Sequence, residues 1–400
     1  MSTSSLPAPA EVLPPPFERY TLLGWLRRNL FSTWYNALLT AICAALIFLA
    51  GRSALEWALG QARWEVITAN LRLFLVGQYP AVATWRVWAC VGLLAALIGL
   101  SWGAWGHARR IGALSTAVLP FVLAMLAEGE TRGALLAVGV AGLLGLGLGL
   151  WRGARLGRWI ILGWILFFPL VIVLVSGFGG ADGALPLVPT NLWGGLLLTL
   201  LLSVVGIVFS FPLGVLLALG RQSGLPAVRA LSVTYIEVVR GVPLVTVLFM
   251  AQLMLPLFLP NVTIDRVVRA MAGIVLFSAA YLAENVRGGL QAIPRGQYEA
   301  ARALGLNTWK TMLLIILPQA LKIVIPVLVG QFIALFKDTS LVVIVGLLEL
   351  MGIAKAVLAQ PDFLGLQAEV YLFVALVYAV FCYVMSDLSQ RLEKRLNTGR

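Results

Sequence analysis

The sequence predicts an all-α integral membrane protein with about ten transmembrane helices, and three observations lead to this prediction. Of the 400 residues, 60% are hydrophobic and only 12% are charged, whereas soluble proteins usually have about 25% charged residues. The apolar residues form several runs of about 18 or more, which is long enough for a helix to cross the hydrocarbon core of a bilayer. Basic residues occur in every second loop between these runs, as expected of a chain that crosses a membrane repeatedly.

The N-terminal part of the chain contains a polar tail followed by about five apolar runs. Residues 1–30 begin with a segment rich in Pro, Ser and Ala that lacks the features of a signal peptide, so we expect a disordered or interfacial cytoplasmic tail. Residues 31–185 are expected to form about five extra transmembrane helices. Gly145 and Gly149 match GxxxG, which favours ordinary close helix packing. The five runs are Tyr35–Gly51, Thr84–Trp102, Ile111–Ala127, Gly133–Trp151 and Trp159–Phe178.

Polar and charged residues at membrane depth distinguish the second half of the chain. Residues 388–400 are expected to be a basic cytoplasmic tail. Leu388, Leu392 and Leu396 recur at helical spacing in this tail, which indicates either an interfacial helix or a face toward a soluble partner. The five further apolar runs are Asn191–Gly220, Val242–Pro260, Arg269–Gly288, Trp309–Leu335 and Gln367–Asp387.

The distribution of basic residues predicts that both termini are cytoplasmic. The formal charge of +12 is concentrated at the ends of apolar runs, where it suits anionic lipid headgroups rather than nucleic acid. The cytoplasmic loops and ends would contain Arg27, Arg28, Arg109, Arg110, Arg152, Arg155, Arg158, Arg221, Arg229, Arg287, Arg295, Arg302, Lys310, Arg391, Lys394, Arg395 and Arg400.

The three cysteines do not indicate a metal site or a disulfide. Cys43, Cys90 and Cys382 lie in separate apolar runs and show no CxxC spacing. We expect them to be small buried hydrophobic side chains.

The loop after the eighth apolar run carries the strongest functional signal. Residues from Tyr298 to Leu304 favour a short cytoplasmic helix, and Gly305 follows where a helix-ending glycine is expected. Small Ala300 and Ala301 on its surface would allow another protein to approach closely, although a connector without a partner is the alternative. The same loop contains Glu299 followed at fixed spacings by Gly305, Ile315 and Leu317-Pro318, and this pattern resembles the EAA loop of ABC importer permeases.

That resemblance implies that the loop of residues 293–308 couples the chain to an ATPase. The residues it assigns to this role are Gln297, Tyr298, Glu299, Ala300, Ala301, Arg302 and Gly305. Three further stretches, Tyr235–Leu244, Ala280–Gly289 and Lys337–Leu341, are similar to the polar amino acid branch of this family. The long N-terminal part resembles that of general L-amino acid permeases.

The resemblance implies a type I (MetI-like) importer core in residues 190–390. It also implies transport of polar L-amino acids across the bacterial inner membrane into the cytoplasm by alternating access. The implied partners are two copies of an ATPase, a second homologous permease and a periplasmic amino-acid-binding protein. The sequence contains no P-loop, so we expect no enzymatic activity and no cofactor in this chain, with ATP and magnesium bound by the partner ATPase. A self-pairing permease would have a similar sequence, and the amino acids carried are left open.

Charged and polar residues near the core are candidates for the substrate pathway, because a charge at membrane depth is costly unless it is paired or hydrated. Glu284 either contacts the amino group of the substrate or forms an ion pair with Arg287 or Arg240. Glu237 and Arg240 precede a Gly-x-Pro sequence that indicates either a gate or a simple bend. The full set is Glu237, Arg240, Glu284, Asn285, Asp338, Thr339 and Ser340.

The residues after the ninth apolar run allow two interpretations. Asp338, Thr339 and Ser340 either cap a partly inserted outer helix from Leu341 to Ala359, or they line an outer gate and receive the binding protein. Counting this helix as a span would place the basic C-terminus outside the cell.

The sequence argues against two other classes of membrane protein. A secondary transporter would show repeated halves with interrupted helices, but the two halves of this chain differ in character. A membrane enzyme would need a cluster of His, Asp, Glu or Cys at the membrane surface, and the sequence indicates none.

Overall fold

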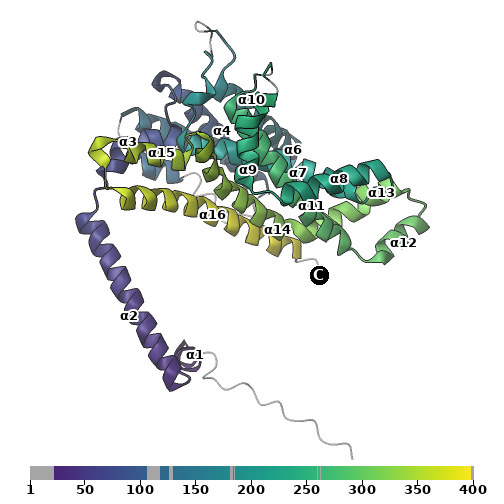
Figure 1. The fold of residues 1–400 in the computed structure, drawn as a ribbon, viewed down its shortest axis with the longest axis horizontal. Helices are drawn as coiled ribbons and strands as arrows, with labels where there is room; N and C mark the ends of the chain where they lie inside the picture. Colours follow the sequence, from purple (N-terminus) through teal and green to yellow (C-terminus); the bar gives the residue numbers. More distant parts are fainter. Residues whose placement is uncertain are drawn as a thin grey trace, which may run out of the picture. The chain divides into compact units, whose positions relative to one another are not determined.

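The computed structural model of the chain describes residues 22–105, 118–125, 129–180, 183, 185–258, 260–261 and 263–397. Almost all of these residues are helical, and the only β-structure among them is two isolated bridges (Figure 1). The chain divides into two compact units, Met1–Trp64 and Glu65–Arg400. The predicted all-helical class is confirmed.

The first unit contains α1 (Leu22–Asn29) and α2 (Trp34–Glu56), which continues into a π-helical turn (Trp57–Gln61). The Thr33 hydroxyl caps α2 by accepting a hydrogen bond from the backbone N–H of Asn36 (3.4 Å). No residue of α2 is buried, and its sequence is apolar on all sides. Such a helix suits a lipid environment.

Eight helices among the described residues are long and apolar enough to cross a membrane, and a bent pair raises this number to nine. The bent pair joins α8 (Pro226–Arg240) to the segment Leu244–Phe258 at an angle of 105°. Nine of the predicted runs coincide with these candidates, while Ile111–Ala127 lies mostly outside the described residues. The eight are Trp34–Gln61, Ala81–Trp105, Gly129–Gly153, Arg155–Ser176, Gly195–Arg221, Arg266–Gln291, Thr308–Val345 and Gln367–Lys394.

Two of these spans form a helical hairpin within α6 (Gly129–Ser176), where Arg152 has non-helical backbone angles. Before this point Gly145 packs on Ala96 of α4 (Thr84–Trp105), and after it the Trp164 indole donates a hydrogen bond to Ser101 of the same helix (2.9 Å). A straight helix would separate Gly145 from Trp164 by about 28 Å, yet both contact the same short stretch of α4. The helical segments before and after Arg152, which are the two arms of the hairpin, therefore fold back on each other.

Glycines allow this hairpin to approach α4 closely. A Cβ atom on Gly145 would lie 2.1 Å from the backbone oxygen of Ala96, and one on Gly149 would lie 2.5 Å from that of Leu100. The predicted packing role of Gly145 and Gly149 is confirmed. Residues 152–158 do not form the expected loop, because the helix resumes directly after the turn.

The second half of the chain is built around α11 (Arg266–Gln291), which packs on α7 (Gly195–Arg221), α8, α9 (Leu244–Phe249) and α14 (Leu317–Asp338). α16 (Gln367–Asn397) runs along α14 (Figure 1). A π-helical turn (Met250–Met254) connects α9 to α10 (Leu255–Phe258).

The two ends of the second unit carry different elements. At one end lie α12 (Arg295–Ala303) and α13 (Thr308–Thr311), and at the other end lie α3 (Glu65–Val76) and α15 (Leu350–Leu358) (Figure 1). α3 was not predicted from the sequence. Its buried Val66 and Phe74 share an apolar cluster with residues of α15 and α16, which ties this short helix to the core.

The prediction of one helix from Leu341 to Ala359 is wrong. A 3₁₀ segment (Thr339–Val345) is followed by Gly346 in the left-handed region (φ 77°), and α15 starts only at Leu350. A Cβ atom on Gly346 would also lie 2.8 Å from a guanidinium nitrogen of Arg266. Backbone conformation and a close side chain thus both favour glycine at the break.

The predicted cap of that helix is also wrong. The hydroxyls of Thr339 and Ser340 donate to the carbonyls of Phe336 (2.7 Å) and Lys337 (2.8 Å) in the preceding turn. The carboxylate of Glu349 caps α15 instead.

Candidate functional site

α12 has the geometry of a short helix with a defined end. Gly305 adopts the left-handed conformation (φ 73°). Its N–H donates to the carbonyl of Arg302 (2.9 Å), and the N–H of Leu306 donates to that of Ala301 (3.1 Å). These two bonds form a Schellman motif, so the predicted helix end at Gly305 is confirmed.

One face of α12 is packed and the other is exposed. Ala301 is buried and Tyr298 packs against the apolar cluster formed by α7, α11 and α14. The expectation that Ala301 lies on the surface is therefore wrong, because residues three apart share the inward face. Gln297, Glu299, Ala300 and Arg302 are exposed.

The exposed face continues into apolar side chains. Leu304 is 78% exposed and Trp309, at the start of the next helix, is 71% exposed. The Gln319 side chain at the start of α14 donates a hydrogen bond to the Gln297 side chain (3.2 Å). Burial raises the pKa of Tyr298, so the phenol is neutral at physiological pH. α12 thus leads to exposed apolar side chains and is directly linked to a membrane helix.

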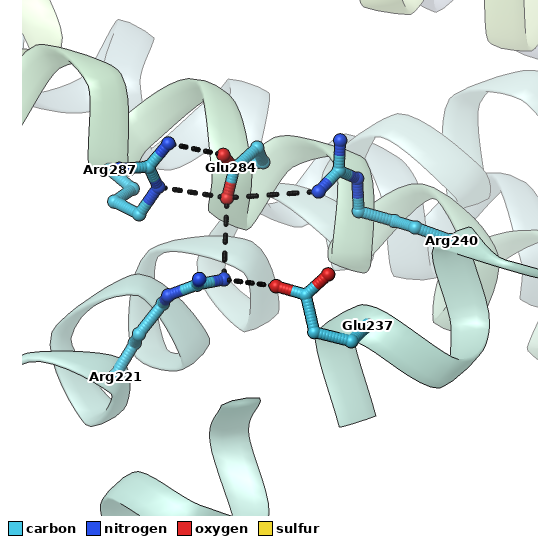
Figure 2. A network of polar contacts seen from close by, with 5 residues as sticks. All are labelled: Arg221, Glu237, Arg240, Glu284 and Arg287. Carbon is cyan, nitrogen blue, oxygen red and sulfur yellow. Dashed lines mark hydrogen bonds and ion pairs between the residues drawn. The ribbon is translucent and has the colours of Figure 1, made fainter. Parts of the chain in front are cut away.

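A second site is a network of five charged residues on α7, α8 and α11 (Figure 2). The Glu284 carboxylate bonds to Arg287 through both oxygens, with one contact of 2.9 Å. The same carboxylate lies 3.5 Å from a guanidinium nitrogen of Arg221 and 3.9 Å from one of Arg240. Arg221 also pairs with Glu237 (2.9 Å).

The ion-pair interpretation of Glu284 matches this geometry. Arg287 and Arg240 were predicted as partners, whereas Arg221, 63 residues away at the end of α7, was not. Three guanidinium groups and two carboxylates leave one net positive charge in the network. The Nε of Arg240 is buried without a hydrogen-bond partner among the described residues, and its guanidinium lies 5.6 Å from the ring centroid of Tyr281.

The seven pathway candidates do not form one site. Glu237, Arg240, Glu284 and the half-buried Asn285 lie toward the end of α11 where Gly289 packs on Ala320 of α14. Asp338 is 18 residues beyond Ala320 on the same helix, a distance of about 27 Å. Asp338, Thr339 and Ser340 therefore lie near the opposite end of α14.

Glu349 is a buried acid that sequence analysis missed. Its carboxylate accepts hydrogen bonds from the backbone N–H groups of Met351 (2.7 Å) and Gly352 (2.9 Å) and from the Tyr378 hydroxyl (3.2 Å). Burial raises the pKa of Glu349 to about 7. A glutamate in an apolar stretch is the sequence signal that could have indicated it.

Metal chemistry has no obvious site in the described part of the chain. No group of three or more His, Cys, Asp and Glu side chains among those residues could hold a metal ion.

Comparisons with known proteins agree with this arrangement. Residues 210–398 match the family described as binding-protein-dependent transport system inner membrane component. The inner membrane amino-acid ABC transporter permease protein YhdY of Escherichia coli K12 is 44% identical over 394 residues, covering 94% of this chain and 93% of that protein.

Two further relatives match different lengths of this chain. The glutamate/glutamine/aspartate/asparagine transport system permease protein BztC of Rhodobacter capsulatus is 39% identical over 419 residues, covering 96% of this chain and 95% of that protein. The glutamate/aspartate import permease protein GltK of Escherichia coli O6:H1 is 39% identical over 207 residues, which are 50% of this chain and 91% of that protein.

A multi-span helical protein with these matches is a membrane-embedded permease subunit of an ABC transporter. Because two relatives are similar over nearly the whole chain, it belongs to the amino-acid permeases of ABC importers, a family of the inner membrane.

Proposed function

We propose that α12 is the surface through which this permease engages a separate ATPase. The observation that carries the proposal is a short helix with a fixed end, whose exposed face leads to the exposed side chains of Leu304 and Trp309. Large exposed apolar side chains where a connecting segment meets a membrane helix suit a protein partner. The proposed coupling residues are Gln297, Tyr298, Glu299, Ala300, Ala301, Arg302 and Gly305. Gln297, Glu299, Ala300 and Arg302 are exposed and would face the ATPase, whereas Tyr298 and Ala301 hold the helix on the permease.

The contacts of α12 suggest how motion passes into the membrane. Tyr298 packs on the cluster between α7, α11 and α14, and Gln297 is hydrogen-bonded to Gln319 of α14. Closure of the ATPase on ATP would pull α12 and open the pathway outward, and hydrolysis would reset it inward. Alternating access follows from this coupling.

The proposed assembly contains two copies of the ATPase, a second homologous permease and a periplasmic amino-acid-binding protein. ATP and magnesium would bind to the ATPase and no cofactor to this chain. Both termini would be cytoplasmic, since basic residues cluster in alternate loops.

We further propose polar L-amino acids as substrates, because the similar protein BztC is a glutamate/glutamine/aspartate/asparagine permease and YhdY an amino-acid permease. Glu284 contacts three arginines, so its charge is already compensated and it is a poor partner for a substrate ammonium group. The net positive charge and the unpaired Nε of Arg240 instead favour a carboxylate. Glu237 and Asn285 would line the same part of the pathway, and Asp338, Thr339 and Ser340 its outer end.

The variant Gly305→Asp tests the coupling role in the importer complex reconstituted in liposomes. A non-glycine residue in the left-handed region costs about 1–2 kcal/mol, so the helix end would shift and ATP-driven uptake would fall about tenfold. Gly224→Asp is the matched control, because Gly224 lies in a neighbouring loop with ordinary backbone angles and open space around it. Uptake that survives in the Gly305 variant would contradict the proposed role.

Affinity purification from the native membrane tests the assembly. We expect an ATPase with a P-loop and a second permease to co-purify and to be identified by mass spectrometry. Recovery of the chain alone, with transport that ignores ATP, would instead support a secondary transporter.

A further inference from the structure

The tip of the α6 hairpin brings aromatic and basic side chains together without any acidic residue. Arg152, Arg155 and Arg158 are exposed there, and Trp151 and Trp159 are 72% and 67% exposed. The Arg152 guanidinium lies 4.4 Å from the ring centroid of Trp151. Trp105, at the end of α4, reaches the same tip, because a Cβ atom on Gly157 would lie 3.8 Å from its indole nitrogen.

The depth of the tip follows from the lengths of the two arms. The spans Gly129–Gly153 and Arg155–Ser176 contain 25 and 22 residues, so each is about 33–38 Å long. Arms of this length cross the hydrocarbon core and leave the turn between them in the headgroup layer. Tryptophan is enriched at this depth.

The three arginines are not neutralised by acidic residues of the described part of the chain. None of them forms an ion pair with a described residue. The sequence contains no Asp or Glu between Glu65 and Glu128 or between Glu130 and Asp182. The arginines of the α7–α8–α11 network, in contrast, are all paired with glutamates.

We propose that the tip of the α6 hairpin binds the headgroup of an acidic phospholipid. The guanidinium groups of Arg152, Arg155 and Arg158 would hold the phosphodiester, and Trp105, Trp151 and Trp159 would pack beside the glycerol and upper acyl chains. A lipid fits better than the ATPase, because the tip lies outside residues 210–398, which match the permease family. The site is independent of the proposed role of α12.

Native mass spectrometry of the full chain in detergent tests this site, with phosphatidylglycerol and phosphatidylcholine of the same acyl chains as probes. We expect the first phosphatidylglycerol to bind more tightly than phosphatidylcholine. The triple variant Arg152→Gln, Arg155→Gln, Arg158→Gln should weaken it about a hundredfold, since each basic residue near a lipid surface is worth about 1 kcal/mol.

A matched control removes three charges elsewhere. Arg27, Arg28 and Arg229 are also exposed and basic, and their replacement by Gln should leave the first phosphatidylglycerol bound as before. Equal losses in both triple variants, or equal binding of the two lipids, would overturn the proposal. Displacement of the lipid by equimolar glycerol phosphate would indicate a soluble phosphate site and would overturn it too. If the triple variant does not fold, Arg155→Gln alone should weaken binding about fivefold.

Discussion

At the residue scale, Glu349 is an acid whose charge is strongly affected by its surroundings. It is completely buried and accepts three hydrogen bonds, but it forms no ion pair with any described residue. Because burial disfavours the charged form, its pKa rises from an ordinary value of 4.5 to about 7. The folded protein therefore keeps this carboxyl protonated between pH 4.5 and about 7, where an exposed glutamate is ionised.

The raised pKa of Glu349 predicts that the stability of the folded protein decreases as the pH rises. The folded state binds the proton more tightly than the unfolded state, so its stabilising effect is complete below pH 4.5 and is lost as the pH rises to about 7. A shift of this size corresponds to about 3 kcal/mol. Thermal unfolding in detergent at pH 5 and pH 8 should show this loss in the wild type and a much smaller one in Glu349→Gln. An identical pH dependence in both proteins would contradict the assignment.

The charged network predicts coupling between Glu284 and Arg287. Either single substitution by Gln leaves a charge without its strongest partner and should lower the free energy of unfolding by about 1–3 kcal/mol. The double variant should recover part of this loss if the pair stabilises the helices. Uptake measured on the same variants separates the roles, because a pathway residue would leave the stable double variant inactive. Additive losses of stability would argue against a direct interaction.

The Glu284 network and Glu349 show which contacts can be predicted from the spacing of residues in the sequence. The pair of Glu284 and Arg287 is three residues apart on one helix, so helical periodicity is sufficient to predict it. Arg221 reaches the same carboxylate from another helix, and only the packing of α7 on α11 brings the two together. Glu349 is foreseen by no spacing rule, since its burial depends on α15 and α16.

At the element scale, the sequence predicts a helix end that is set by a neighbouring residue. It does not predict one that depends on contacts with residues far away in the sequence. The end of α12 depends on Gly305 alone, whose left-handed conformation closes the helix. The segment from Leu341 to Ala359 has the composition of one helix, but Gly346 and the adjacent Arg266 divide it. Arg266 is far from Gly346 in the sequence, so its contribution could not be inferred.

The close contact of α4 with α6 predicts opposite effects for two neighbouring glycines. In Gly145→Ala the new Cβ atom would lie 2.1 Å from a backbone oxygen, so the helices must separate, with a loss of about 1–3 kcal/mol. Gly147 has open space around it, and Gly147→Ala should gain stability through the higher helix propensity of alanine. Thermal unfolding of the two variants in one detergent compares them directly. A greater loss for Gly147→Ala would contradict the hairpin packing.

At the scale of the whole molecule, composition and charge distribution were sufficient to predict the class. The apolar runs identify nearly all the candidate spans, because lipid requires a long apolar helix wherever the chain crosses it. The hairpin contacts and the position of α3 could not be predicted, since both depend on which helices pack together. Because the sequence does not show which helices pack together, it also could not predict that the seven pathway candidates divide into two distant groups.

The arrangement of α12 and α15 at opposite ends of the second unit predicts opposite sides of the membrane. Single cysteines at the exposed positions Arg302 and Asp362 are introduced after replacement of Cys43, Cys90 and Cys382 by alanine. In intact spheroplasts, a membrane-impermeant maleimide should label position 362 and not position 302, and permeabilisation should make both reactive. Labelling of both positions before permeabilisation would contradict the proposed orientation.

The absence of a loop in the α6 hairpin also constrains how the protein is made. The turn at Arg152 joins two long apolar arms directly, so neither arm has a spacer that would let it settle in the bilayer before the other leaves the ribosome. We therefore expect the two arms to pass from the translocon into lipid as a pair, after the second has been synthesised. Protease resistance of the first arm should consequently appear only once the second arm has been synthesised.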